Sequence, residues 1–195
     1  IETFELEITL VEGAVSTASV NNNNQCFALN KFTFSADTDD EDFADVDLTY
    51  FWNFGPEATP QTSTSKFPPF VRFNSVGDFE VILETITNGD CSTYDTIDVT
   101  TYVLEGEITG DKEGCAPYTG TFTPGNINPD YTYSWKIQGQ IFNQETITYT
   151  FPNPGFYDIQ LVIEEFATGC ESILIEPEFI EIYENPVPDF LISDT

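Results

Sequence analysis

GDFEVIL, at residues 77–83, and GFYDIQL, at residues 155–161, are two copies of one strand pattern. Apolar residues occupy alternate positions in both, as Phe79, Val81 and Leu83 do in the first copy. A period of two brings side chains to one face of a β-strand, so each segment predicts a strand with one buried face. Turns rich in Gly, Pro and Asn separate such segments, and no window keeps a helical apolar stripe over three turns. The chain therefore favours an all-β sandwich of many strands.

Further out, both strands stand in a longer repeat with the same order of landmarks. Each copy runs from a Cys to a Trp, then to the strand, and then to a second Cys. The landmarks are Cys26, Trp52 and Cys91 in the first copy and Cys115, Trp135 and Cys170 in the second. We therefore expect two tandem domains, at residues 1–103 and 104–195. Within them, we expect residues 1–12 to be the last strand of a preceding copy or an additional N-terminal strand, and residues 186–195 to be the first strand of a following copy.

The charge of the chain is strongly one-sided. Its 195 residues include 34 Asp and Glu but only 5 Lys and Arg, which gives a formal net charge of −29. Five cationic side chains cannot neutralise a nucleic-acid backbone or an anionic membrane surface. Both classes of partner are therefore excluded. No run of about 18 apolar residues is present, so we expect no membrane insertion.

The residue types also limit the chemistry. The chain contains no His, and its 4 Cys include no closely spaced pair. A catalytic His and a zinc site built from Cys and His are therefore excluded. The sequence has no nucleophile elbow and no phosphate-binding loop, and neighbouring carboxylates are expected by chance among so many acids. We expect no enzymatic activity and no required cofactor.

Two further stretches accompany the strand copies. YFWNFG at residues 50–55 precedes the first strand, and YSW at residues 133–135 precedes the second. Together with the strands, these stretches resemble the PKD (polycystic kidney disease) domain, whose pattern is roughly Y-x-W-D-F-G-D-G, then P-x-H-x-Y, then G-x-Y-x-V-x-L. The resemblance implies two tandem Ig-like (PKD-like) β-sandwich domains.

The sequence departs from the family pattern in both copies. Asn53 and Pro56 stand where the family favours Asp, and KIQG at residues 136–139 lacks the Phe-Gly pair. Copies with a Cys ahead of the second strand resemble the PKD arrays of Bacteroidetes surface proteins, which include gliding-motility adhesins and other type IX-secreted proteins. That resemblance implies a secreted or cell-surface protein of cell adhesion, in which these modules are a non-catalytic spacer beside neighbouring copies. The alternative is a carbohydrate-binding accessory module of a secreted polysaccharide-degrading enzyme, with surface glycans as ligands.

Trp52 and Trp135 occur where a seven-stranded sandwich carries a Trp that packs across its core. The alternative role is that of an exposed platform on which sugar rings stack. We expect both side chains to pack in the core.

The four cysteines are divided evenly between the copies, which favours disulfides over thiol chemistry in an extracellular chain. One bridge per copy would join Cys26 to Cys91 and Cys115 to Cys170. However, we expect the two cysteines of a copy at opposite ends of a sandwich, about 20 Å apart for a six-residue strand, whereas a disulfide needs Cα atoms within about 7 Å. We therefore favour a bridge between neighbouring copies, from Cys26 to Cys170, with Cys91 and Cys115 serving copies outside this chain.

The densest acidic stretch, residues 37–47, precedes the strand that holds Trp52, and it carries 7 carboxylates in 11 residues. Ca²⁺ prefers six to eight oxygen ligands, which such a stretch can supply in part. The candidate ligands are Asp37, Asp39, Asp40, Glu41 and Asp42. The stretch lacks the central Gly and the terminal Glu of an EF-hand loop, so a solvated, self-repelling loop is the alternative.

Overall fold

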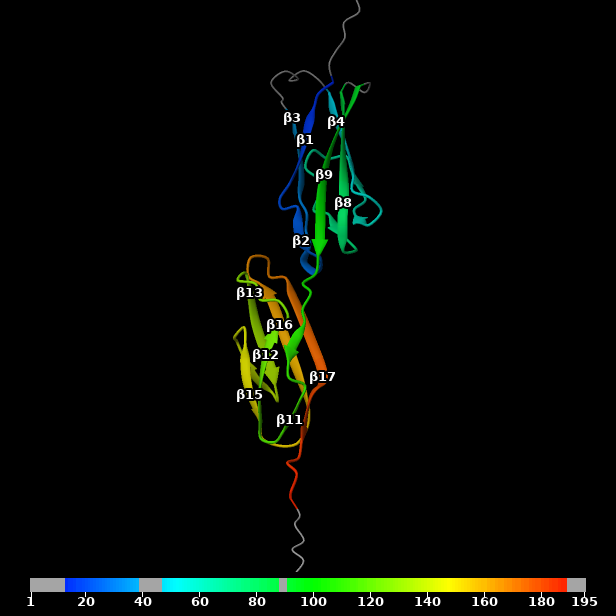
Figure 1. Ribbon diagram of the computed structural model, residues 1–195. Helices are drawn as coiled ribbons and strands as arrows, with labels where there is room; N and C mark the ends of the chain where they lie inside the picture. Colours follow the sequence, from blue (N-terminus) through cyan, green and yellow to red (C-terminus); the bar gives the residue numbers. More distant parts are fainter. Residues whose placement is uncertain (1–12, 39–46, 88–90, 189–195) are drawn as a thin grey trace, which may run out of the picture. The chain divides into compact units, whose positions relative to one another are not determined.

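A computed structural model of the chain describes residues 13–38, 47–87 and 91–188. The chain divides after Tyr102 into two compact units. In the described ranges each unit is built of β-strands, and the only helix is η1, a 3-10 turn at Phe27–Leu29 (Figure 1). No helix of the described residues is long and apolar enough to cross a membrane. The predicted all-β fold is confirmed.

The described part of the first unit contains strands β1 to β9. Their bounds are β1 Ser16–Val20, β2 Asn24–Cys26, β3 Phe34–Thr38, β4 Leu48–Asn53, β5 Ala58–Thr59, β6 Thr62–Ser63, β7 Arg72–Phe73, β8 Gly77–Thr87 and β9 Cys91–Tyr102. One sheet has the order β2-β9-β8-β4-β6, β1 pairs with β3 in a second sheet, and β5 pairs with β7 in a short ribbon. β2 joins β9 in parallel, whereas the other pairs are antiparallel.

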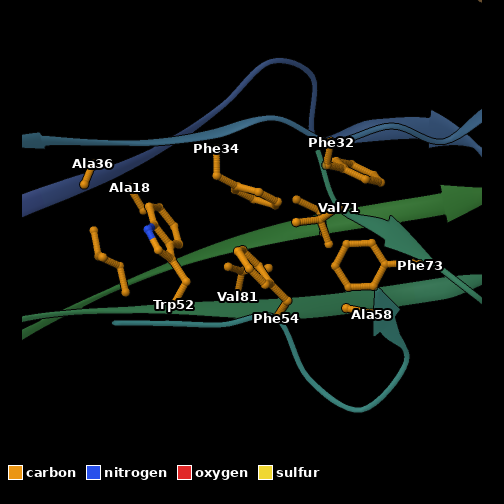
Figure 2. Close-up of a cluster of buried hydrophobic side chains, with 12 residues drawn as sticks. Ala18, Phe32, Phe34, Ala36, Trp52, Phe54, Ala58, Val71, Phe73 and Val81 are labelled. Carbon is orange, nitrogen blue, oxygen red and sulfur yellow. The ribbon is translucent and has the colours of Figure 1, made fainter. Parts of the chain in front are cut away.

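The core of the first unit lies between the two main sheets. Phe34 and Ala36 enter it from β3, and Trp52, Val81 and Leu83 enter it from the five-stranded sheet (Figure 2). The ring centroids of Phe34 and Trp52 are 5.6 Å apart, so the layers interlock through aromatic contact. Val81 and Leu83 are fully buried, which is the face that their alternation predicted. The unit is therefore a β-sandwich.

The second unit repeats this design with strands β10 to β17. Their bounds are β10 Ile108–Gly110, β11 Glu113–Cys115, β12 Tyr118–Pro124, β13 Tyr131–Ile137, β14 Gln140–Phe142, β15 Ile147–Phe151, β16 Gly155–Glu165 and β17 Glu171–Tyr183. The sheets have the orders β10-β12-β15 and β11-β17-β16-β13-β14, and β11 joins β17 in parallel. The large aromatic side chains between them are buried; these are Phe122, Trp135 and Phe151.

The two units pair their Trp side chains in the same way. Trp52 lies opposite Leu83 on the neighbouring strand, and Trp135 lies opposite Leu161 in the same way. Residues 186–188 follow the last strand and form no strand themselves. The strand that we expected at residues 1–12 lies outside the described residues, and so do residues 189–195 of the strand that we expected at residues 186–195.

β17 contains a β-bulge opposite Asp158. Its ladder with β16 runs up to Glu176 and resumes at Ile180. Within the bulge, Glu178 has a positive φ of 51°, and its N–H donates to Asp158 Oδ1 at 2.8 Å. Pro177 also lies there, where its missing N–H interrupts no ladder bond. The bulge therefore divides the longest strand of the unit into two parts.

Candidate functional sites

Both Trp side chains are internal. Trp52 and Trp135 have no exposed surface. The indole N–H of Trp52 donates to the carbonyl oxygen of Ser65, and that of Trp135 donates to the carbonyl oxygen of Gln144, each at 3.0 Å. Neither ring is open to stack on a sugar, so their role is packing between the sheets.

Of the five candidate calcium ligands, only Asp37 lies among the described residues. Asp37 lies in β3, where it accepts a hydrogen bond of 2.9 Å from the hydroxyl of Ser19. The other candidate calcium ligands lie outside the described residues; these are Asp39, Asp40, Glu41 and Asp42. Among the described residues, no group of three or more His, Cys, Asp or Glu is arranged to hold a metal ion. The calcium hypothesis stays a prediction.

The register of the first unit separates its two cysteines. Cys26, in β2, lies opposite Tyr102, the last residue of β9. Cys91 is the first residue of β9 and lies opposite Thr87. β9 has 12 residues, and at a rise of about 3.3 Å per residue its ends are roughly 36 Å apart. A disulfide between Cys26 and Cys91 is therefore excluded.

The second unit places its cysteines in the same way. Cys115, in β11, lies opposite Tyr183, the last residue of β17. Cys170 directly precedes β17, which begins at Glu171 and has 13 residues. One disulfide per unit is thus excluded here as well, because the ends of such a strand lie several times farther apart than a disulfide reaches.

The four cysteines differ in state and in exposure. Cys26 and Cys170 are buried, with 4% and 1% of their surface exposed, and both are disulfide-bonded. Cys91 and Cys115 are exposed and free. The expected pairing of Cys26 with Cys170 stays a prediction, and peptide mapping tests it.

The outer face of the five-stranded sheet of the first unit carries an aromatic and acidic row. Phe51 on β4 lies opposite Glu84 on β8, and Glu84 lies opposite Tyr94 on β9. Phe51 is 39% exposed and Tyr94 is 67% exposed. Because adjacent strands are about 4.8 Å apart, the two rings flank the carboxylate at a backbone separation of about 10 Å. We call Phe51, Glu84 and Tyr94 the outer-face row.

Hydrogen bonds orient the carboxylate of this row. The hydroxyls of Ser92 and Tyr94 each donate to Glu84 Oε1 at 2.8 Å. The hydrogen bond to Glu84 raises the pKa of Tyr94 above its ordinary value of 10.0, because ionisation of the phenol would lose this bond, and the charge of Glu84 adds to the effect. Both bonds use Oε1, so lone pairs on Glu84 can accept further hydroxyl donors.

A shallow hollow of about 600 Å³ adjoins the row, and its lining includes Thr49, Phe51, Thr64, Glu84 and Ile86. Apolar surface, an aromatic ring and a carboxylate thus meet on one flat face. This combination suits a neutral, hydroxyl-rich ligand, since its C–H faces can pack on the rings while its hydroxyls donate to the carboxylate.

The second unit does not repeat the outer-face row. The matching positions are Ser134, Val162 and Ile173, which carry neither an aromatic ring nor a carboxylate. The row is therefore a property of the first unit alone. Alternation along β4 predicts that Phe51 faces outward, because its neighbour Trp52 faces the core. The sequence did not show that Phe51, Glu84 and Tyr94 would lie side by side on three strands.

No protein-family model matches the sequence, and no curated protein matches it. Solved structures resemble it in shape. The three N-terminal domains of the bacteriophage RB49 highly immunogenic outer capsid protein (Hoc) match with a TM-score of 0.48 and 17% identity, over 87% of this chain and 59% of that one. This chain thus spans less than two thirds of that structure.

Two other solved structures show the same kind of likeness. A putative membrane-anchored protein of Corynebacterium diphtheriae matches with a TM-score of 0.38 and 9% identity, over 86% of this chain and 53% of that one. The fibronectin(III)-like modules of Clostridium thermocellum CbhA match with a TM-score of 0.34 and 8% identity, over 91% and 100%.

Proposed function

We propose that the chain is a non-catalytic spacer of a secreted or cell-surface protein, in which PKD-like sandwiches follow one another as they do in adhesins. The observation that carries this proposal is the repetition of one sandwich whose two cysteines lie at opposite ends. One cysteine of each unit is disulfide-bonded, which fits an oxidising, extracellular compartment. The resemblance to Bacteroidetes surface arrays extends the proposal to adhesion and gliding motility.

The dimensions of each unit suit a spacer. β8 and β9 pair continuously from Gly77 to Thr87, and β16 pairs with β17 along most of its length (Figure 1). Strands of 12 and 13 residues give each unit a long dimension of about 40 Å. Bending a unit would break cross-strand hydrogen bonds along its whole ladder, so each unit extends the protein as a stiff block.

The charge supports the same role. A net charge of −29 makes identical modules repel one another, which keeps crowded surface proteins apart. The sequence offers no His for acid–base chemistry, and a spacer needs none. We therefore propose that the chain has no enzymatic activity.

Deletion of one unit from the full-length protein tests the proposal. Removal of residues 103–188 is expected to shorten the projection seen by electron microscopy by about 40 Å, the length of one unit. Secretion and the binding activity of the remaining protein are expected to persist. Loss of binding without a change in length would contradict the spacer role.

The outer-face row favours a second candidate function, the binding of a neutral glycan by the first unit. Phe51 and Tyr94 supply two exposed rings, and Glu84 between them supplies an oriented acceptor. A glycan array probed with the intact chain tests this candidate. Saturable binding that falls at least about tenfold (~1.4 kcal/mol) in Phe51→Ala and Tyr94→Ala would support it.

Phe156→Ala is the matched control, because Phe156 is 58% exposed but belongs to the second unit, which does not carry the row. If this variant loses binding to the same extent, the glycan does not bind at the outer-face row. If the intact chain binds no glycan, the spacer proposal stands alone.

A further inference from the structure

Each unit carries one cysteine of each of two kinds. Cys26 and Cys115 lie on the short strand that joins the last strand in parallel, opposite its final residue. Cys91 and Cys170 lie in the hairpin that leads into the last strand, at the other end of the unit. We call the first kind the parallel-strand cysteines and the second kind the hairpin cysteines.

Each kind includes one disulfide-bonded cysteine and one free cysteine. One parallel-strand cysteine, Cys26, and one hairpin cysteine, Cys170, are disulfide-bonded. One of each kind, Cys115 and Cys91, is free and exposed. Both free thiols thus occupy positions whose repeat equivalents form disulfides in the same chain. This equivalence indicates that Cys91 and Cys115 also form disulfides, which the exposure of a surface thiol alone would not indicate.

We infer that Cys91 and Cys115 are the two complementary halves of one junction between modules. The parallel-strand cysteine of one module forms a disulfide with the hairpin cysteine of another copy of the module. The inference rests on the proposed function, because only a tandem arrangement supplies such copies on both sides. The partner of each free thiol is therefore another sandwich of this kind.

The fold explains why neither thiol finds a partner in its own unit. The partner of the other kind sits at the far end of a strand roughly 36 Å or more in length, well beyond the reach of about 7 Å between Cα atoms. The two kinds lie at opposite ends of a unit, so a contact that joins them is head-to-tail. A head-to-tail contact between identical molecules repeats from copy to copy, so it closes into a ring or continues as an open chain.

The chemistry of the junction is a two-electron oxidation. The S–H bonds of Cys91 and Cys115 break, their sulfurs form one S–S bond, and their two protons end on the two thiols that the oxidant becomes. The two electrons pass to a disulfide oxidant, whose own S–S bond is reduced to two thiols. Oxidised glutathione serves as that oxidant in the test below.

Two single variants of the full chain separate the two thiols. Cys91→Ser retains only the Cys115 thiol free, and Cys115→Ser retains only the Cys91 thiol free. Each variant is incubated alone, and the two are incubated together, in a buffer of oxidised and reduced glutathione. Covalent dimers are followed by non-reducing electrophoresis and by mass spectrometry of the linked peptides. Both substitutions fall on exposed side chains, and circular dichroism checks that each variant is folded.

The mixture is expected to form a covalent dimer at least about tenfold faster than either variant alone, the preference that a modest docking contact provides. The linked peptides should contain Cys91 and Cys115. The unsubstituted chain should give a ladder of oligomers, and Cys91→Ser/Cys115→Ser should stay monomeric. Equal rates in all three incubations, or only glutathione adducts, would overturn the inference.

The outcome is independent of the spacer test. The deletion of one unit measures length and does not require the free thiols. If the mixture shows no preference but the deletion shortens the projection, the spacer stands and the junction fails. If the deletion leaves the length unchanged, the spacer itself fails.

Discussion

Replacement of Asn30 by Ala should destabilise the first unit through its effect on one buried strand. Asn30 is 3% exposed, and its amide takes the place of a neighbouring strand beside Phe73. Its Oδ1 accepts from the N–H of Phe73 at 2.8 Å, and its Nδ2 donates to the carbonyl oxygen of Phe73 at 3.0 Å. Nδ2 also donates to the carbonyl oxygen of Phe27 at 2.7 Å. Ala can make none of these bonds.

The loss of stability in Asn30→Ala depends on the backbone groups that are left without a hydrogen bond. Phe73 is itself 1% exposed, so water does not readily replace the lost partner. A buried backbone group without a hydrogen bond costs about 1–3 kcal/mol, and both the N–H and the carbonyl of Phe73 are affected. We therefore expect the free energy of unfolding of the first unit to fall by about 2–4 kcal/mol.

Hydrogen exchange measured by mass spectrometry reads each unit separately. Exchange of the most protected β8 amides should accelerate by about 30- to 1,000-fold in Asn30→Ala, the equivalent of that loss of free energy. Amides of β16, in the second unit, provide an internal reference. Asn23→Ala is the matched control, because the side chain of Asn23 is exposed in the same unit.

An acceleration below about threefold in β8 would refute the reasoning, since it corresponds to less than about 0.7 kcal/mol. It would mean that the carbonyl and N–H of Phe73 find other partners. An equal acceleration in Asn23→Ala would also refute it, because the effect would then not depend on the buried contacts.

The remaining predictions concern backbone strain, pH, disulfides and calcium. Gly77→Ala and Gly155→Ala should each cost about 1 kcal/mol in urea unfolding, because the positive φ angles of 146° and 143° strain any other residue although the space is open. Glu84→Gln should lower the pKa of Tyr94 towards 10.0 in an ultraviolet titration. Because the pKa of Tyr94 is raised in the folded state, its contribution to stability is present below the unfolded pKa and is lost as pH rises through the folded one. Asp111→Asn, which removes the negative charge beside the hydroxyl of Tyr118, should leave the pKa of Tyr94 unchanged. Non-reducing peptide mapping should recover Cys26 linked to Cys170, and a peptide that links Cys26 to Cys91 would contradict the pairing. Calorimetry should detect binding of millimolar Ca²⁺ if residues 37–47 hold the ion, and no heat would exclude the site.

The alternating segments predicted the sandwich well because burial of every second residue is a local property. Val81 and Leu83 lie in the core where the period of two placed them, and the position of Trp52 in the repeat predicted its burial. The separation of the cysteines also followed from topology. The observed strands, twice as long as the six residues assumed, make that argument stronger.

The outer-face row and the Asn30 contacts could not be predicted in the same way. Phe51, Glu84 and Tyr94 meet only because three strands take one register, and register depends on turns and on packing of the opposite face. Asn30 acts on a residue 43 positions away in the sequence. Nothing in the sequence around Asn30 indicates that its amide will bond the backbone of Phe73 in the way that a neighbouring strand does.

The bulge in β17 bears on solubility. β11 pairs only with residues from Glu181 to Tyr183, and in the described structure the earlier part of β17 has no strand beyond it. Such an open border is a template on which an unfolded or foreign chain can add itself. Pro177 and the turned backbone at Glu178 limit that template to a short run, and the Glu side chains along it add repulsion. The bulge and the charge of β17 therefore oppose the stacking of copies of this unit into fibrils, even at high concentration.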